Sequence, residues 1–495
     1  MKQQFSVFSC IWLLACYLLL AQRAVAQGYD DPLTIQGIDH TTLQSAASRA
    51  AGGTTIGLQN DVGLMFSNPA SLQSLKEIQL SVGALQQNTN QKQVQQYSPL
   101  KYYSNFSLVM EGLTGYIPNP DTLLGGSDPG DTVQRPYDTI GPNWSRSKNK
   151  GSPIQAFLAV PFSIGGMNFA AGAGFVEYAN LNHYYQNNNV LSPVIGSDRP
   201  VPVQLPPSDS TPVVTNWSSF FRSREGSIRG YCLALSGSLS EGISVGVSGM
   251  LLKGTTDDIE QRRARGRFVF YKQWFRLDST YGRSSATGTS DFSGAEFTFS
   301  GICRGRYVSV GFSVKPPATI KRKYTTLMQV VDTTGSSALT VSGEDNIRLP
   351  WRGTLGLSIL ATQNLTLGLE YEIRSYASAV YKNAAGLGSN PWLSSSVIHV
   401  GAEYRASPWL ALRGGIRGNA EVFEQTGNPI PGEPVSYSIY STGAGFLFSG
   451  IRLNITYEYA LMKYQDTWQT NVNLNSETHH GFVADVSYEI PWTHE

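Results

Sequence analysis

The chain has 495 residues, of which only 15% are charged, and its formal net charge is +1. The near-zero net charge excludes a basic nucleic-acid-binding protein and an acidic tail. Low charge, 50 glycines and 11% aromatic residues exclude disorder, coiled coil and collagen, and favour a sheet that faces lipid on one side and water on the other.

The N-terminus predicts an export signal. Lys2 precedes an apolar run, and Ala24–Ala26 forms a small-residue cleavage site, so residues 1–26 are a predicted signal peptide and the mature chain starts at Gln27. A lipoprotein signal ending at Cys16 is the alternative, but the apolar residues that follow it favour ordinary cleavage. After the signal, no stretch reaches the ~18 apolar residues of a spanning helix. The protein is therefore expected in the periplasm, outside the cell or in an outer-membrane barrel.

The segment 27–75 differs from the rest of the chain. It contains the small-residue run Ala46–Gly53 and the mixed run Phe66–Leu72, and it is too apolar for a free tail. A segment of this length fits inside a barrel as a plug or hatch. The predicted organisation is thus a signal peptide, a hatch over 27–75, and a barrel with long extracellular loops over 76–495.

The barrel region predicts repeated β-hairpins. In the clearest pair, Arg352–Ala361 and Leu365–Ser375, apolar residues alternate with Glu370, Glu372 and Arg374. A charge at every second position suits a strand between lipid and a wet lumen. The other predicted hairpins are 154–178, 227–254, 291–316, 396–418 and 436–462, and single strands are predicted at 76–86 and 481–490.

Six hairpins and two single strands give a predicted total of 14 strands. The links within pairs are short and the connections between pairs are long, which is typical of a bacterial outer-membrane barrel. The even count places both termini on the short-turn, periplasmic side. A propeller or β-helix is the alternative all-β fold, but it needs a fixed repeat of ~40–50 residues or less, which this sequence lacks.

Sequence patterns for catalysis and metal binding are weak. Gly242–Gly246 matches G-x-S-x-G, but it lies in a predicted hairpin turn and strand, without the strand–turn–helix of a nucleophile elbow. His479 and His480 are adjacent in a strand and face opposite sides, so they do not share a metal ion. Cys232 and Cys303 are predicted on the lumen and lipid faces, and therefore do not form a disulfide. We expect no enzyme activity, no catalytic residue, no metal and no cofactor.

Several segments resemble the FadL-type family of outer-membrane transporters. They are the run Ala46–Gly53, the segment Gly57–Asp61, and the tripeptide Asn68, Pro69 and Ala70 just before the first strand. Arg352–Leu357 and Gly401–Gly415 are also similar to that family. The resemblance implies a 14-stranded barrel with an N-terminal hatch in its lumen, placed in the bacterial outer membrane. Its partners would be membrane lipid and hydrophobic small molecules, either long-chain fatty acids or aromatic hydrocarbons.

The resemblance also implies a mechanism. Loops 87–153 and 179–226 would form an outer apolar groove in series with a lumen pocket, because each CH₂ group loses ~0.8 kcal/mol when moved into water. Ligand binding would shift the hatch and open a passage, often sideways into the bilayer. Asn68, Pro69 and Ala70 are carried over as hatch residues; Pro69 would fix the turn before the first strand, and Asn68 would cap backbone groups there. The chain end Trp492–Glu495 departs from the usual terminal aromatic residue.

A ligand carboxylate would need a cation in the lumen. The charged residues predicted to face the lumen are Glu370, Glu372, Arg374, Glu403, Arg405, Arg413, Arg417 and Glu458. The alternative is that these acids and bases pair and brace the barrel. The alternative function is a barrel of the same shape that binds partners in a secretion or surface-assembly system. Transport predicts a continuous apolar lining, whereas partner binding predicts a sealed or loosely filled lumen.

Overall fold

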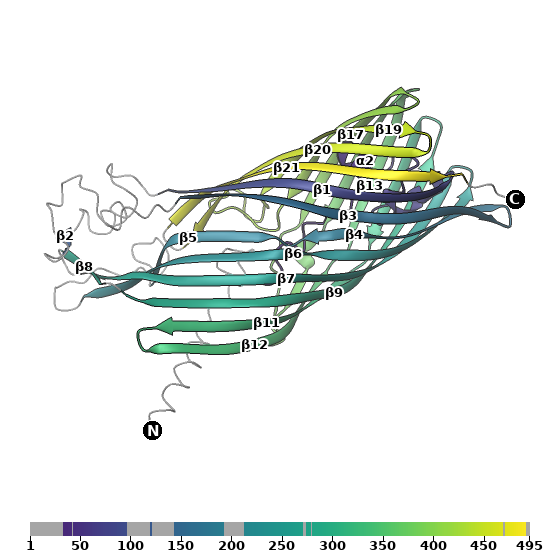
Figure 1. Cartoon of the computed structure of the whole chain (residues 1–495). Coiled ribbons are helices and arrows are strands. Elements are labelled where there is room, and N and C mark those ends of the chain that lie inside the picture. The colour runs from purple at the N-terminus through teal and green to yellow at the C-terminus, as the bar shows by residue number, and fades with distance from the viewer. Residues whose placement is uncertain are drawn as a thin grey trace.

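The chain folds into one closed antiparallel β-barrel with 14 wall strands (Figure 1). The computed structural model describes residues 33–41, 43–96, 119–120, 143–192, 212–270, 274–278, 280–468 and 471–491. The predicted signal peptide, the apolar part of the first long loop, and the chain end fall outside these ranges. Strand β1 (Ile78–Gln96) pairs with both β21 (Asn471–Ile490) and β3 (Trp144–Ile164), and these two pairings close the barrel.

The wall strands follow one another in chain order. Between β3 and β21 they are β4 (Met167–Asn180), β6 (Val213–Ser240), β7 (Ile243–Phe270), β9 (Gly282–Arg304), β10 (Val308–Lys315), β13 (Arg352–Thr362), β14 (Leu365–Arg374), β17 (Ser395–Ser407), β18 (Leu410–Ala420), β19 (Ser436–Phe448) and β20 (Ile451–Trp468). Each predicted short turn joins the expected pair, and Gly165, Gly166, Gly242 and Gly450 have positive φ there. The predicted strand number and turn positions are confirmed.

The wall extends far beyond one end of the barrel. β6 and β7 have 28 residues each, whereas about 9–11 tilted residues cross a bilayer. Outer elements continue the wall or decorate it: β2 (Asn119–Pro120), β5 (His183–Ser192), β8 (Trp274–Asp278), β11 (Ala318–Asp332), β12 (Gly335–Leu349), η5 (Tyr376–Ser378), β15 (Val380–Lys382) and β16 (Gly388–Ser389). The connections 255–290 and 317–350, which the sequence analysis treats as loops, are therefore mostly strand. That expectation is wrong because apolar and polar residues do not alternate regularly in the extended strands, as in Leu327–Val331, so the pattern that marks a membrane strand is missing.

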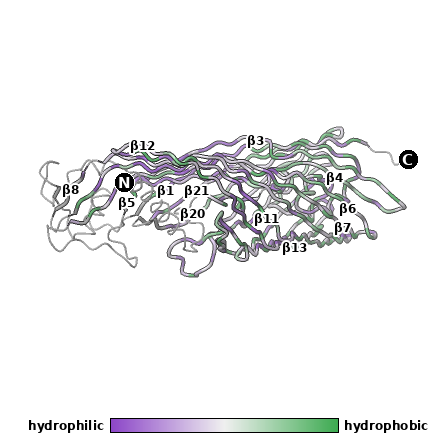
Figure 2. Tube along the Cα trace, turned by 90° about the horizontal axis from the view of Figure 1, so that it is seen from below, coloured by the Kyte–Doolittle hydropathy of each residue, from purple (hydrophilic) through white to green (hydrophobic). Residues whose placement is uncertain are grey.

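The outer face carries a band of exposed apolar side chains. The exposed side chains include Leu233 and Leu235 on β6 and Phe297 and Phe299 on β9. Glu296, which directly precedes Phe297 in β9, is buried. Figure 2 shows that hydrophobic residues concentrate toward the short-turn half and hydrophilic residues toward the extended half. The band identifies the short-turn half as the membrane-spanning part. Among the described residues no helix has the length and apolarity needed to cross a membrane.

The described part of 33–75, here called the plug segment, lies inside the lumen. It contains α2 (Ala46–Ala50) and the 3₁₀-helices η1 (Val62–Phe66) and η2 (Pro69–Ser74). The Ser45 hydroxyl accepts a hydrogen bond from the backbone N–H of Ser48 and caps α2. Helix α2 contacts β18, β19 and β20, whereas η2 contacts β6, β7 and β9. The plug segment therefore crosses the lumen from one side of the wall to the other.

Candidate functional site

The plug segment is seated against glycines of the wall. A Cβ added to Gly401 would lie 2.0 Å from the carbonyl oxygen of Ala51, and one added to Gly415 would lie 2.3 Å from the backbone nitrogen of Gly52. Across the lumen, a Cβ on Gly246 would lie 2.4 Å from the backbone nitrogen of Ala70. Wall glycines in such contact with the plug segment are Gly246, Gly311, Gly356, Gly368, Gly401, Gly415 and Gly443. Larger residues at the tightest of these positions would force the plug segment away from the wall.

The Asn68–Ala70 tripeptide is one of these contact points. Pro69 is the first residue of η2, and the backbone N–H of Ala70 donates to the Ser300 hydroxyl on β9 at 2.8 Å. The buried side-chain amide of Asn68 makes no helix cap; its Nδ2 donates to the Thr55 hydroxyl at 3.4 Å. The predicted capping by Asn68 is wrong, and Pro69 begins a helix rather than fixing a turn directly before β1. The tripeptide instead fastens the plug segment to itself and to the wall.

The predicted lumen charges pair with one another. Glu372 accepts from Arg374 at 2.9 Å, Glu403 accepts from Arg405 at 3.2 Å and from Arg413 at 2.8 Å, and Glu458 accepts from Arg417 at 2.5 Å. The Arg405 side chain lies near the short turns and is 54% exposed, unlike the buried Arg413. Two of these pairs lie within one strand, β14 or β17. The Glu403–Arg413 pair joins β17 to β18, and the Glu458–Arg417 pair joins β20 to β18. The pairs between strands brace the barrel, which is the alternative left open above for these charges. Contact of any of them with a ligand stays a prediction.

Two of the predicted acids bind the plug segment itself. The Glu370 carboxylate accepts hydrogen bonds from the backbone N–H groups of Thr55 and Ile56, the latter at 2.8 Å. Glu458 accepts from the buried guanidinium of Arg49 in α2 at 2.9 Å, while its other oxygen accepts from Arg417. Glu458 thus joins a helix of the plug segment to two strands of the wall.

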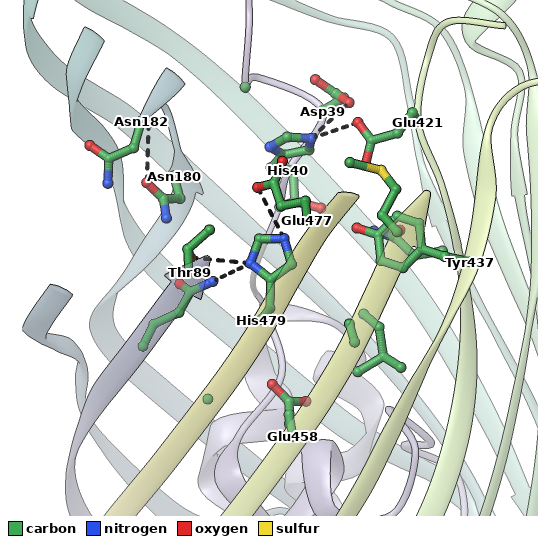
Figure 3. Close-up of a pocket in the computed structure, with 18 of the residues that line it drawn as sticks. Asp39, His40, Thr89, Asn180, Asn182, Glu421, Tyr437, Glu458, Glu477 and His479 are labelled. Atoms are coloured by element: carbon green, nitrogen blue, oxygen red, sulfur yellow. Dashed lines mark hydrogen bonds and ion pairs between the residues drawn. The ribbon is translucent and has the colours of Figure 1, made fainter. Parts of the chain in front are cut away.

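A cavity of about 310 Å³ lies on the extended side of the plug segment (Figure 3). Its described lining includes three consecutive lumen-facing cations of β3, Arg146, Lys148 and Lys150. Lys150 contacts Glu177 at 2.9 Å, and the Arg146 guanidinium lies 4.0 Å from the centre of the Tyr184 ring. The plug segment and the wall from β18 to β21 supply most of the described lining, and about a third of it comes from segments 87–91, 146–150 and 177–184. These belong to the two connections predicted to form the outer groove, together with the residues just before the second.

Another side of the same cavity is apolar. It is lined by Leu85, Phe423, Ile439, Ala460, Met462 and Tyr464. Phe423 and Tyr464 pack edge to face with ring centroids 5.2 Å apart. The cavity therefore combines a cationic strand with an apolar patch, and its lining is not the continuous apolar surface expected of a simple hydrophobic channel. Of the predicted charged residues, Arg374, Arg417 and Glu458 line it.

The wall is interrupted beside this cavity. Strand β4 ends at Asn180 and β5 begins at His183, and the pairing of β4 with β6 shifts register between Glu177 and Ala179. The plug segment meets the wall here, because Thr41 forms a β-bridge with Ala179. The plug segment thus contacts wall strand β4 at the point where its outer continuation is offset.

The fold of this 14-stranded barrel is similar to that of known structures. A FadL homologue from Pseudomonas aeruginosa has a TM-score of 0.57 and 12% identity over 92% of this chain and 99% of its own. The fold is that of the FadL-type transporters. The toluene transporter TodX of P. putida has a TM-score of 0.55 and 13% identity over 92% of this chain and 100% of its own. TbuX, the toluene transporter of Ralstonia pickettii, has a TM-score of 0.50 and 12% identity over 92% and 99%.

No family model matches this sequence, and no curated protein does. The likeness to the FadL-type structures is therefore one of fold, at identities of 12–13%. The G-x-S-x-G match at Gly242–Gly246 runs from the β6–β7 turn into β7, as expected from the sequence, and so lacks the geometry of a nucleophile elbow. Cys232 is buried and Cys303 is exposed, and both are free thiols, as predicted.

One cluster of titratable side chains, at the point where the lumen opens into the cavity, was not predicted from the sequence. The His40 Nε2 lies 3.0 Å from a Glu421 carboxylate oxygen and 3.5 Å from an Asp39 carboxylate oxygen (Figure 3). Burial by itself would lower the pKa of His40, but the carboxylates of Asp39 and Glu421 outweigh it and raise that pKa to about 10. Burial also raises the pKa of Asp39.

The residues missed by sequence reasoning share one property. Arg49, Asp39 and His40 lie in the plug segment, and their partners Glu458 and Glu421 are more than 370 residues away in the chain. The sequence feature that indicates one of these contacts is Arg49, an isolated arginine within the small-residue run Ala46–Gly53. A lone charge that folds into a lumen needs a counter-charge from the wall.

Proposed function

We propose that this protein is a bacterial outer-membrane transporter that takes up hydrophobic ligands through a plugged FadL-type barrel. The observation that carries the proposal is the cavity on the extended side of the plug segment, which combines cations of β3 with an apolar patch from β19, β20 and the connection after β18. The exposed apolar band around the wall supports placement in a bilayer. The FadL-type fold supports a transport role.

The cavity favours an amphipathic ligand with an anionic head, such as a long-chain fatty acid. Apolar residues such as Met462 and Ile439 would hold the chain, at a gain of ~0.8 kcal/mol for each buried CH₂ group. Arg146 and Lys148 lie 3.8 Å and 2.6 Å from the exposed carboxylate of Glu225. A ligand carboxylate would compete with Glu225 for these cations, since charge-assisted hydrogen bonds are the strongest class. An aromatic hydrocarbon offers these cations only a cation–π contact, which is weaker than a charge-assisted hydrogen bond, so it is the less favoured ligand.

Passage requires the plug segment to move. It contacts wall strands on both sides of the lumen through the wall glycines described above, here called the glycine seat, and through Glu370 and Glu458. A ligand in the cavity is therefore separated from the short-turn end until these contacts loosen. The direction of exit, sideways or along the axis, stays a prediction.

The test compares a long-chain fatty acid with its methyl ester, using purified protein in detergent and then in liposomes. Both share the alkyl chain, but only the acid carries a charge. We expect saturable binding and uptake of the acid, and weaker binding of the ester. Arg146→Glu should lower the affinity for the acid and leave the affinity for the ester almost unchanged. Arg283→Glu is the matched control, because this arginine of β9 does not line the cavity.

The second candidate function is a partner-binding barrel of a secretion or surface-assembly system. The observation that favours it is the extended sheet, since β6 at ~3.3 Å per residue is about 90 Å long and most of it lies beyond the membrane band. Folded protein that binds neither the acid, the ester nor an alkylbenzene would contradict transport. That result would favour the partner-binding function.

A further inference from the structure

The Asp39–His40–Glu421 cluster has the ligand types of a cation site, and the sequence does not predict it. We propose that these three residues bind a divalent transition-metal ion of the zinc type, which fastens the start of the plug segment to the connection between β18 and β19. The site is empty. Asp39 and His40 come from the plug segment, whereas Glu421 directly follows β18 (Figure 3).

The geometry fits a metal ion. The ligand atoms of the three residues all lie within 4.8 Å of one another, and the His40 nitrogen lies 3.0 Å and 3.5 Å from the two carboxylate oxygens. Zinc binds histidine nitrogen and carboxylate oxygen at about 2.0–2.2 Å, so two ligands of a tetrahedral zinc ion are roughly 3.3–3.5 Å apart. The two distances from His40 therefore need shifts of only a few tenths of an ångström. The carboxylate oxygens of Asp39 and Glu421, which lie within 4.8 Å of each other, need to approach by at most about 1.5 Å.

The ligand types select the ion. One imidazole with two carboxylates suits zinc and similar transition metals, whereas calcium and magnesium prefer oxygen ligands alone. Three protein ligands leave one coordination position free, as in zinc sites that also bind water. The His40 side chain is 43% exposed and lines the cavity, so the free position and the entry path both lie on the cavity side.

The charges around the cluster favour a cation. The side chains of Asp39 and Glu421 are only 5% and 6% exposed, and Glu477 adds a third carboxylate that acts on His40. The neighbouring cation Arg374 already pairs with Glu372 at 2.9 Å. Glu477 itself lies 3.1 Å from the His479 ring. Two buried carboxylates that converge on one imidazole hold excess negative charge, which a divalent ion would neutralise.

The consequence is a metal-dependent latch. Residues 37–41 lie at the interruption of the wall, where Thr41 bridges Ala179 and the backbone N–H of Asn180 donates to the carbonyl of His40. A metal ion bound to His40 and Glu421 would hold this stretch against the opposite side of the cavity. Without the ion, the ion pair between His40 and Glu421 and the contacts of His40 and Thr41 with β4 would hold this stretch. The inference stands on the cluster alone and does not depend on the identity of the transported ligand.

The test is titration of chelator-treated, folded protein in detergent with Zn²⁺ alone, followed by calorimetry, and with Co²⁺ alone, followed by its visible spectrum. We expect one ion per chain. His40→Ala and Glu421→Gln should each weaken binding at least about tenfold. His479→Ala is the matched control, because His479 lines the same cavity without belonging to the cluster. Only variants that keep the heat-modifiable electrophoretic mobility of a folded barrel are compared.

Two results would overturn the proposal. One is the absence of stoichiometric binding to the folded wild-type protein, in which case the cluster is an ion pair only. The other is binding that survives in both His40→Ala and Glu421→Gln. The latch has a separate readout, hydrogen exchange of the amides in 37–41. Exchange that slows on adding Zn²⁺ supports the latch, and exchange that stays unchanged while Zn²⁺ binds contradicts it.

Discussion

Replacing Gly415 with alanine should unseat the plug segment. The new Cβ would lie 2.3 Å from the backbone nitrogen of Gly52, 2.6 Å from its Cα and 2.7 Å from the carbonyl carbon of Ala51. These are backbone atoms, which cannot turn aside as a side chain can, so the plug segment must move. Overpacking of this kind costs about 1–3 kcal/mol. At ~1.4 kcal/mol for each factor of ten, the ratio of unseated to seated plug segments should rise about 5- to 150-fold.

The assay is the conductance of single barrels in a planar lipid bilayer. Gly415→Ala should open more often than the wild type by about that factor, and a variant lacking 33–75 sets the upper limit. The matched control is Gly414→Ala one residue earlier, where the nearest atom to an added Cβ is the Ser441 carbonyl oxygen at 3.9 Å. If Gly415→Ala and Gly414→Ala conduct equally while the deletion variant conducts strongly, the glycine seat does not hold the plug segment and the reasoning is refuted.

Three further results are expected. Glu370→Gln should weaken two backbone hydrogen bonds of the plug segment and cost roughly 1–3 kcal/mol, seen as faster amide hydrogen exchange at Thr55 and Ile56. The folded pKa of His40, about 10, exceeds its unfolded value of ~6.5. The stabilisation of the folded protein by charged His40 should therefore be complete below pH ~6.5 and lost as the pH rises toward 10. The thermal stabilities of wild type and His40→Gln should converge near pH 10. The charged or titratable groups around His40 are Asp39, Glu421, Glu477, His183 and Arg374. A maleimide should label Cys303 in folded protein in detergent, and Cys232 only after denaturation.

The membrane part of the fold can be predicted from the sequence because lipid and lumen impose opposite demands on neighbouring residues. In β14 the alternation of Leu367 and Leu369 with Glu370 and Glu372 places every strand residue on a known face. Above the membrane, water lies on both faces. The outer halves of β6, β7 and β11 therefore mix polar and apolar residues without a regular alternation, as in Leu327–Val331, and this pattern does not separate a strand from a loop.

The candidate site is predictable only in part. The parity of Glu458 and Arg417 places both in the lumen, since strand periodicity fixes the direction of a side chain. The partner of each is decided by how the plug segment folds, which no periodicity describes. Arg49 reaches Glu458 across 409 residues of chain, and His40 reaches Glu421 across 381. Such contacts follow from the closure of the barrel around the plug segment rather than from any local pattern.

Side chains that hold the plug segment in the lumen also line the cavity. Ligand binding in the cavity is therefore coupled to the contacts that hold the plug segment. Glu458 binds Arg49 of the plug segment and Arg417 of the wall, and all three line the cavity. A carboxylate ligand that binds Arg417 competes with Glu458 for that cation. Removing one partner from a buried ion pair costs about 3–5 kcal/mol unless a new partner takes its place. An anionic ligand can supply that replacement and an uncharged hydrocarbon cannot, so the proposed opening should respond to ligand charge as well as to ligand hydrophobicity.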